Sequence, residues 1–243
     1  MSVGDEHSCA VDLNRRVHCW GLGIDPSRFE RDGDVDQASP PNDLGEVAEI
    51  SLGARHSCAI IGDGQIRCWG DQRDGQSQPP ELPWPAVELS SGEAHSCARS
   101  EEGEVVCWGA NAFGQSTAPE LEIQEMEIGG ALTCGRISDQ SFSCWGSSEP
   151  LSVPSGPLAY LAVGSEIVCT QALDQNGASG TIEIDCQLSS SQSSLRAPIS
   201  SFQLAGQRLK SLVAGSREVC ALGTDERLSC YGDHSPSTRP VVR

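Results

Sequence analysis

A short sequence unit recurs along the whole chain. Its second and third copies read GARHSCAIIGDGQIRCWG from Gly53 and GEAHSCARSEEGEVVCWG from Gly92. In all six copies a cysteine stands five residues after a glycine, and in five of them a second cysteine follows ten residues later. The glycines are Gly4, Gly53, Gly92, Gly129, Gly164 and Gly215. This self-similarity predicts a repeat architecture in which every copy is one structural unit.

Each unit has the pattern of a β-hairpin. In the second copy, alternate positions are apolar or cysteine, and the residues GDG supply a turn. Pairing about Asp63 sets Ile60 opposite Ile66 and Cys58 opposite Cys68. Residues that face each other across two strands have Cα atoms about 4.5–5.5 Å apart, which lies within the range of a disulfide. The spacing therefore predicts a disulfide across each hairpin.

The twelve cysteines fall into six such pairs with none left over, which favours disulfides. The fifth unit has a longer middle, LDQNGASGT, which lengthens the hairpin tip and leaves the pairing possible. Disulfides indicate an extracellular, periplasmic or cell-surface protein. The alternative is reduced thiols in a cytosolic protein; zinc is disfavoured because no Cys-x-x-Cys pair occurs. The expected pairs are Cys9–Cys19, Cys58–Cys68, Cys97–Cys107, Cys134–Cys144, Cys169–Cys186 and Cys220–Cys230.

Further short strands accompany each hairpin. Apolar-alternating runs such as EVAEISLG and LKSLVAG end at the repeat glycines, and Gly-Gln loops follow two of the Cys-Trp-Gly elements. Three or four strands per unit are typical of propeller blades. The Gly-x-x-His-Ser-Cys-Ala, Trp-Gly and Gly-Gln-x-x-x-Pro elements resemble the regulator-of-chromosome-condensation (RCC1-like) repeat, a β-propeller family. The paired cysteines resemble its secreted bacterial branch.

The resemblance implies an all-β fold, with a single β-propeller over residues 1–243. We count six blades, although the best-known family members have seven. The N- and C-terminal segments are expected to pair and close the ring, which removes exposed sheet edges. The repeat cores are residues 4–21, 53–70, 92–109, 129–146, 164–188 and 215–232.

The charge balance restricts the partners. With 16 Lys and Arg against 34 Asp and Glu, the net charge is −18, which repels nucleic acid and anionic lipid. A basic protein, a cation or a neutral glycan remains compatible, and so does an acidic surface that only maintains solubility. No apolar run is long enough to cross a membrane. The start, MSVGDEHSCA, lacks a signal peptide and opens within a repeat, so we expect an excised or processed domain.

The recurring polar and aromatic residues have structural interpretations. The histidines His7, His56 and His95 are expected to make a hydrogen bond between a strand and a loop, and the recurring tryptophans to pack between blades. Trp84 lies outside the pattern and is a candidate exposed anchor. Asp32, Asp34 and Asp36 weakly suggest a calcium loop, but Gln37 replaces the turn glycine that such a loop requires. We expect no catalytic residue, no metal and no cofactor.

Loops on a rigid scaffold commonly carry function. We therefore expect a non-catalytic, secreted or surface-displayed module that binds a protein partner through one face, as the resemblance to an exchange factor and a secreted enzyme inhibitor implies. Two alternatives remain: a glycan-active or glycan-binding enzyme that uses the central channel, and a structural module of a larger surface protein. The candidate binding residues, which follow the repeat glycines, are Glu6, Arg55, Glu93, Glu166 and Arg217, with Trp84 in addition.

Overall fold

The chain folds into six antiparallel sheets that follow one another along the sequence. The computed structural model describes residues 1–22, 35–146, 153–173, 181–188, 201–205, 208–215, 218–232 and 237–240. The first three sheets consist of β1 (Ser2–Val3), β2 (His7–Val11) and β3 (Val17–Gly21); β4 (Val47–Leu52), β5 (His56–Ile61) and β6 (Gln65–Gly70); and β7 (Glu88–Ser91), β8 (His95–Arg99) and β9 (Val105–Gly109).

The last three sheets have the same order, and two of them have a fourth strand. They consist of β10 (Glu125–Gly129), β11 (Leu132–Arg136) and β12 (Phe142–Gly146); β13 (Leu158–Val163), β14 (Ile167–Ala172), β15 (Thr181–Leu188) and β16 (Ser201–Ala205); and β17 (Leu209–Ala214), β18 (Glu218–Gly223), β19 (Arg227–Gly232) and β20 (Ser237–Pro240). Each sheet contains one copy of the repeat, so each unit is one blade of a propeller.

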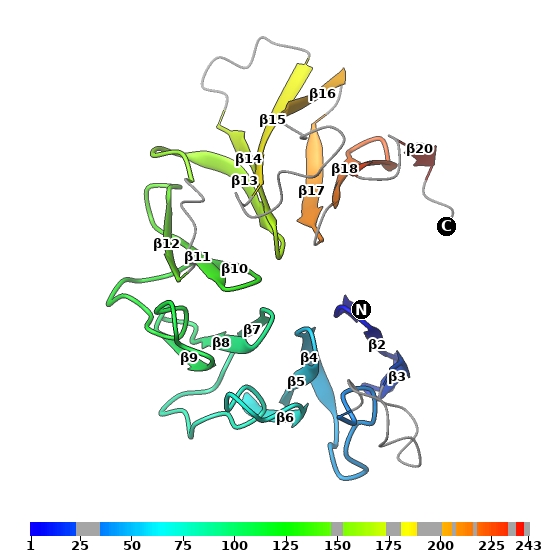
Figure 1. Cartoon of the computed structure of the whole chain (residues 1–243), viewed down its shortest axis with the longest axis vertical. Coiled ribbons are helices and arrows are strands. Elements are labelled where there is room, and N and C mark those ends of the chain that lie inside the picture. The colour runs from blue at the N-terminus through cyan, green and yellow to red at the C-terminus, as the bar shows by residue number, and fades with distance from the viewer. Residues whose placement is uncertain are drawn as a thin grey trace.

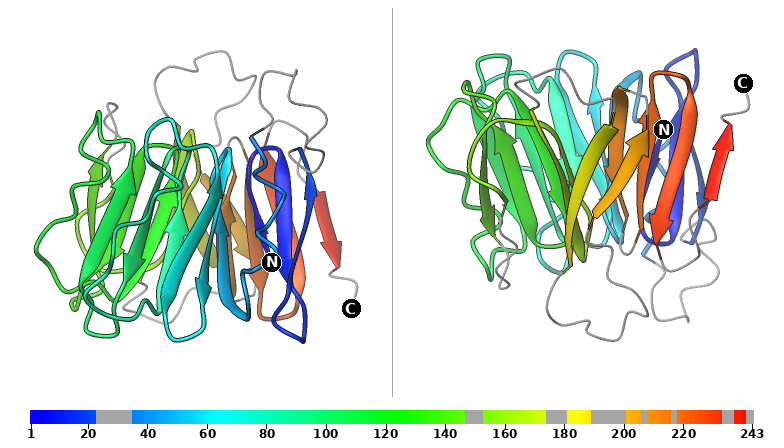
Figure 2. Two further views of the ribbon diagram at one scale, coloured as in Figure 1. Left: turned by 90° about the horizontal axis from the view of Figure 1, so that it is seen from below. Right: turned by 90° about the horizontal axis from the view of Figure 1, so that it is seen from above.

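The six blades stand around a central axis, with the first strand of each blade innermost (Figure 1). Seen from the side, the strands run between the two faces of a disc, where the connecting loops gather (Figure 2). The first and last described strands, β1 and β20, lie on the same side of the ring (Figure 1). Among the described strands, β20 pairs with β19 and β1 pairs with β2. Pairing between the two terminal segments therefore stays a prediction.

The hairpin register is the one that the sequence predicts. Ile60 lies opposite Ile66, and Cys58 lies opposite Cys68. All six expected cysteine pairs are bonded, with Cα atoms 4.0 to 4.1 Å apart. The long fifth hairpin keeps Cys169 opposite Cys186 despite its extra residues. A longer tip is tolerated because the register is set by the paired strands below it.

The hydrophobic core is divided into clusters that lie between neighbouring blades. Cys9 of the first blade packs in one cluster with Leu52 and Trp69 of the second. The next cluster joins Cys58 to Trp108 in the same way. Cysteine and tryptophan are adjacent in the Cys-Trp-Gly element, so they point to opposite faces of a strand. Each blade therefore has a cysteine face, which meets the next blade, and a tryptophan face, which meets the preceding one.

The repeat glycines let the blades approach each other near the axis. A Cβ atom added to Gly53 would lie 2.5 Å from the carbonyl oxygen of Gly92 in the next blade. At Gly92 it would lie 2.7 Å from the carbonyl oxygen of Gly130. Real Cβ contacts are not this short, so glycine is required wherever two inner strand ends converge.

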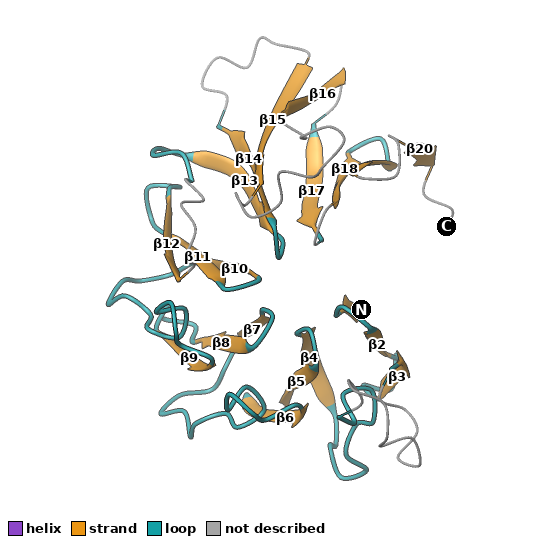
Figure 3. Ribbon diagram, in the orientation of Figure 1, coloured by secondary structure: helices purple, strands orange, loops and turns teal. Residues whose placement is uncertain are grey.

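Strands and loops make up the described part of the chain (Figure 3). Within it, no helix is long and apolar enough to cross a membrane.

Candidate functional site

The recurring histidines join one blade to the next. The hydrogen bonds run from His7 Nε2 to Ser57 Oγ, from His56 Nε2 to Ser96 Oγ and from His95 Nε2 to Thr133 Oγ1, each at 2.8 Å. The sequence predicted a structural bond between a strand and a loop. The structural role holds, but the partner is a strand of the neighbouring blade, because a periodic sequence cannot show which copies lie side by side.

These histidines are buried and uncharged at neutral pH. Burial lowers the pKa of each of His7, His56 and His95 to about 4, and for His56 the nearby His95 and His7 contribute further. The hydroxyl of Ser57 donates to the carbonyl oxygen of Gln37 at 2.7 Å, so its oxygen accepts the Nε2 proton of His7. The imidazole of His7 is thus held as the Nε2 tautomer, and the Ser57 hydroxyl beside it is fully buried.

The later blades replace this polar pair with an apolar one. Leu132 and Ile167 stand at the histidine position of the fourth and fifth blades. Leu132 packs in one cluster with Val168 of the next blade, and Ile167 packs in another with Val219. Both members of the pair change together, since an unpaired buried polar group is costly. The histidine position is therefore a joint between blades, not a reactive site.

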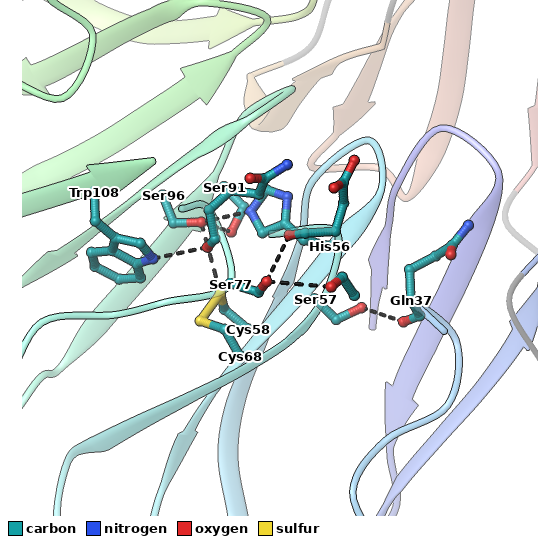
Figure 4. Close-up of a disulfide and its surroundings, with 12 residues drawn as sticks. Gln37, His56, Ser57, Cys58, Cys68, Ser77, Ser91, Ser96 and Trp108 are labelled. Atoms are coloured by element: carbon teal, nitrogen blue, oxygen red, sulfur yellow. Dashed lines mark hydrogen bonds between the residues drawn. A yellow bond between two sulfur atoms is a disulfide. The ribbon is translucent and has the colours of Figure 1, made fainter. Parts of the chain in front are cut away.

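The tryptophans bind the loop that connects the preceding blade. The indole nitrogens of Trp69, Trp108 and Trp145 donate to the backbone carbonyl oxygens of Gln37, Gln76 and Gln115 at 2.9, 2.9 and 3.1 Å. Figure 4 shows this arrangement around the Cys58–Cys68 disulfide, with Ser57 directed at Gln37 and His56 near Ser96. Trp69 and Trp108 pack between neighbouring blades, as the sequence predicts.

The glutamines of these loops have a structural role that was not predicted from the sequence. Each side chain accepts the backbone N–H group two residues earlier, at 2.9 to 3.0 Å, and each is almost fully buried. The recurrence of Gly-Gln was the available signal. Asp36 takes the place of the glycine in the first loop, with a φ of 60°, which matches Gly75 and Gly114 in the others. The first connecting loop therefore has the same glutamine-centred conformation as the next two. We call this conformation the glutamine clamp; its central residues are Gln37, Gln76 and Gln115.

The three aspartates of the suggested calcium loop lie in or before the first glutamine clamp. Asp32 and Asp34 lie outside the described residues, and Asp36 belongs to the clamp. Within the described ranges, no group of three or more His, Cys, Asp or Glu side chains is placed to hold a metal ion.

The loops that follow the first five repeat glycines line a central cavity of about 800 Å³. Its lining includes Asp5, Glu93 and Glu218. Among the predicted binding residues, Glu93 lines this cavity, Glu6 is exposed beside it, and Arg217 lies outside the described residues.

The other predicted binding residues are less accessible than the exposed Glu6 and Glu93. Glu166 is half-buried. Arg55 is half-buried too, and its Nε atom lies 3.9 Å from a carboxylate oxygen of Asp71, which also binds Arg73. Trp84 is half-buried against Ile66 and Leu82 and lines a separate groove. The loops are brought together at one end of the ring, and whether these residues bind a partner stays a prediction.

Several carboxylates lie between the blades, where the sequence did not single them out. Burial, with a contribution from the charge of Glu88, raises the pKa of Glu49 to about 7. Burial, with the charges of Glu125 and Glu88, raises the pKa of Glu127 to about 8. Glu88 itself accepts the backbone N–H of Met126 in the next blade at 2.8 Å and pairs with Arg99.

These carboxylates bear on the enzyme alternative. That alternative predicted titrating groups that face the channel, whereas the shifted carboxylates Glu49 and Glu127 are not among the residues that line the cavity. A glutamate recurs four residues before the repeat glycine, as Glu49, Glu88 and Glu125, and was the signal for these three; Glu127 stands two residues before Gly129 and has no such recurrence.

Comparisons with known proteins agree with this geometry. Residues 1–23, 47–76 and 86–115 match the Regulator of chromosome condensation (RCC1) repeat. No curated protein sequence matches the chain.

Solved structures share the fold. The ectodomain of the Arabidopsis thaliana receptor kinase ACR4 is 22% identical with a TM-score of 0.71, over 98% of this chain and 80% of that one. The ectodomain of the Physcomitrella patens receptor kinase CR4 is 26% identical with a TM-score of 0.69, over 94% of this chain and 59% of that one. Prp20p of Saccharomyces cerevisiae is 18% identical with a TM-score of 0.67, over 95% and 70%.

The sequence repeat, the strand register and the contacts between blades all indicate the same fold. The six disulfides indicate an oxidising environment. Three histidines, three tryptophans and three glutamines of the repeat hold neighbouring blades together: His7, His56, His95, Trp69, Trp108, Trp145, Gln37, Gln76 and Gln115. The chain is a six-bladed β-propeller in which residues 1–23, 47–76 and 86–115 match the RCC1 repeat.

Proposed function

We propose that this protein is a non-catalytic, secreted or surface-displayed module that binds a protein partner through the loops after the repeat glycines. The observation that carries the proposal is that each repeat contains two kinds of position, repeated residues that pack between blades and variable residues in a loop. Its fixed residues are buried in the joints, whereas the two positions after each glycine differ between blades, and in the first five blades the first of these positions lines the cavity. A rigid ring with variable loops at one end is suited to recognition.

The partner surface is expected to be basic. Asp5 and Glu6 are exposed on the first of these loops, and Glu93 is exposed on the third. The net charge of −18 extends this negative potential over the molecule, which favours encounter with a positively charged protein. Prp20p, which shares this fold, binds Gsp1p and histones, and a structure shows Kap60 bound to it. In that protein the propeller is therefore a scaffold for protein binding.

Two charge reversals on opposite faces test the proposal. The variant Glu6→Lys with Glu93→Lys changes the proposed binding face. The variant Glu101→Lys with Glu102→Lys makes the same change of net charge at a hairpin tip, which lies at the other end of the blade because strands alternate in direction. All four side chains are exposed, so both variants should fold.

The readout is chemical cross-linking of each variant to the surface and secreted proteins of its host, followed by mass spectrometry. The wild type and the hairpin-tip variant should both be cross-linked to the partner. The binding-face variant should yield less of the cross-linked product by roughly tenfold or more. Equal loss in both variants would show that only net charge matters, and retention in both would place the binding surface elsewhere.

A further inference from the structure

A groove of about 820 Å³ lies beside the hairpin tip of the second blade. One wall is the tip between β5 and β6, residues 63–66, and the other is the chain that leads from β6 to β7, residues 79–85 (Figure 1). The length of β5 separates this tip from the loop after Gly53, so the groove is remote from the binding face proposed above. Its volume is within the range of about 300–1,000 Å³ that is usual for ligand sites.

The two walls of the groove are held together at Gly64. Its carbonyl oxygen accepts the N–H group of Ala86 at 2.9 Å. A Cβ atom added to Gly64, whose φ is 96°, would lie 2.5 Å from the Cβ of Pro85. Because a real Cβ contact is not this short, glycine is what allows the tip to approach the second wall. The width of the groove is therefore fixed by backbone contacts.

The second wall is stiff because of its sequence, PPELPWP from Pro79. Four of these seven residues are proline. Proline has a fixed φ and restricts the residue before it to extended conformations. A wall that is already ordered loses little conformational entropy when a ligand binds. The groove is thus a preorganised surface.

Trp84 stands in this wall, and the repeat does not require it. The preceding connecting segment has the same length between its clamp glutamine and the next repeat glycine, and Gly45 occupies the position of Trp84. Trp84 is half-buried together with Ile66 and Leu82, and all three line the groove. The propeller can therefore form this connection without an aromatic side chain, which makes the indole available for a ligand.

Several polar groups of the groove have no partner within residues 35–146, which the structure describes without a gap. The indole N–H of Trp84 makes no hydrogen bond there, whereas those of Trp69 and Trp108 each reach a glutamine carbonyl. The exposed carboxylates of Asp63 and Glu81 form no ion pair there. The residues that line the groove include no Lys, Arg or His. The groove thus combines an apolar wall, one open N–H donor and two negative charges that no neighbour neutralises.

These features favour an extended peptide over a sugar. A peptide in the polyproline II conformation has no internal hydrogen bonds, so its carbonyl groups are free to accept an indole proton while its proline rings pack on an aromatic surface. A neutral sugar has hydroxyl groups around its ring, and a wall of proline, leucine and isoleucine would leave most of them without partners. Two carboxylates add a preference for a Lys or Arg side chain.

We propose that this groove binds an extended, proline-containing peptide segment of a partner protein. A Lys or Arg of the segment pairs with Asp63 and Glu81, and one of its backbone carbonyl groups accepts the indole proton of Trp84. Its proline rings pack on Trp84 and Ile66. The site is separate from the loops after the repeat glycines and does not depend on the function proposed for them.

Selection from a displayed library of random ten-residue peptides tests the proposal. The library is first depleted on the Trp84→Gly variant, which removes peptides that bind other surfaces, and is then selected on the wild type. This variant has the residue of the preceding connecting segment and should therefore fold. The selected sequences should be rich in proline and in Lys or Arg. If no peptides are enriched, or if the enriched ones lack proline or a basic residue, the proposal is wrong.

The affinity of a selected peptide, followed by fluorescence anisotropy, separates the two kinds of contact. Trp84→Phe keeps an aromatic ring but removes the N–H donor, and should weaken binding by about fivefold or more. Asp63→Asn with Glu81→Gln should weaken it by about tenfold or more and reduce its dependence on salt. The control is Glu101→Gln with Glu102→Gln, which makes the same change of charge at the exposed tip of the third blade and should leave the affinity unchanged.

The NMR signal of the Trp84 indole N–H locates the bound peptide. This signal is assigned by its absence from the Trp84→Phe variant and should shift when the peptide is added, whereas those of the buried Trp69 and Trp108 should stay in place. Chitohexaose and cellohexaose are the sugar probes, and a shift with either of them but not with peptides would overturn the proposal. Glu6→Lys with Glu93→Lys should still bind the peptide, so the failure of one proposed site can be distinguished from the failure of the other.

Discussion

At the scale of the residue, the most unusual group is Glu127, a half-buried carboxyl on β10, the inner strand of the fourth blade. Its pKa is raised to about 8 because burial and the charges of Glu125 and Glu88 disfavour the ionised form. In the unfolded chain a glutamate titrates near 4.3. The folded state therefore holds a proton between these two values that the unfolded state has released, and its stability falls as the pH rises through this range.

Glu127→Gln should remove this penalty. The amide is similar in shape to the protonated acid and does not ionise. The free energy of unfolding, measured with urea and the disulfides intact, should be nearly unchanged at pH 4 and higher than that of the wild type by a few kcal/mol at pH 9. Glu120→Gln, at an exposed carboxylate, is the control and should have little effect at either pH. A destabilised Glu127→Gln variant at pH 9 would contradict the assignment.

At the scale of the element, the Gly-Gln loop is what joins a blade to the next one. Gln76 accepts the backbone N–H of Asp74 at 2.9 Å through its side chain, while its own carbonyl accepts the indole of Trp108. The side-chain bond shapes the loop so that the carbonyl points at the indole. The loop therefore acts as a connector with a fixed conformation, although it contains no regular secondary structure.

Gln76→Ala should destabilise the protein by about 1–3 kcal/mol, because it deletes a buried side chain and leaves the N–H group of Asp74 without its partner. Amide hydrogen exchange should accelerate over residues 71–78 and at Trp108. Gln78→Ala removes an exposed glutamine two residues away and should change neither quantity. Similar effects of the two variants would mean that the loop is not held by its buried glutamine.

The strands and their register within each blade could be predicted from the sequence, because the spacing of residues within one repeat depends only on the geometry of that hairpin. The ten-residue spacing set Cys58 opposite Cys68, and the longer Cys169–Cys186 spacing marked an extended tip without loss of register. Contacts between copies could not be read in the same way. That His7 binds Ser57 depends on how neighbouring blades rotate about the axis, which no single unit contains. Glu127 was missed for the same reason, because the charge of Glu88, which helps to raise its pKa, belongs to the neighbouring third blade.

At the scale of the whole molecule, the joints contain two sets of titrating groups with opposite effects on stability. The pKa of His7, His56 and His95 is lowered to about 4, so the unfolded chain binds protons on these residues between pH 4 and 6.5 that the folded state does not. Stability from this set rises with pH over that range. The pKa of Glu49 and Glu127 is raised to about 7 and 8, so stability from that set falls with pH up to those values.

The balance predicts an optimum near pH 6.5. Between about pH 4.5 and 6.5, three histidines favour higher pH and two glutamates oppose them, so the net slope is positive by about one proton. Above pH 6.5 only the glutamates contribute, and the slope becomes negative. The measurement is the free energy of unfolding from pH 4 to 9 in 0.5 M NaCl, which screens the general repulsion from a net charge of −18. The double variant Glu49→Gln with Glu127→Gln should lose the decline above pH 6.5 and keep the rise below it. A wild-type optimum below pH 5, or a decline that persists in the double variant, would show that the buried joints do not govern the pH dependence of this ring.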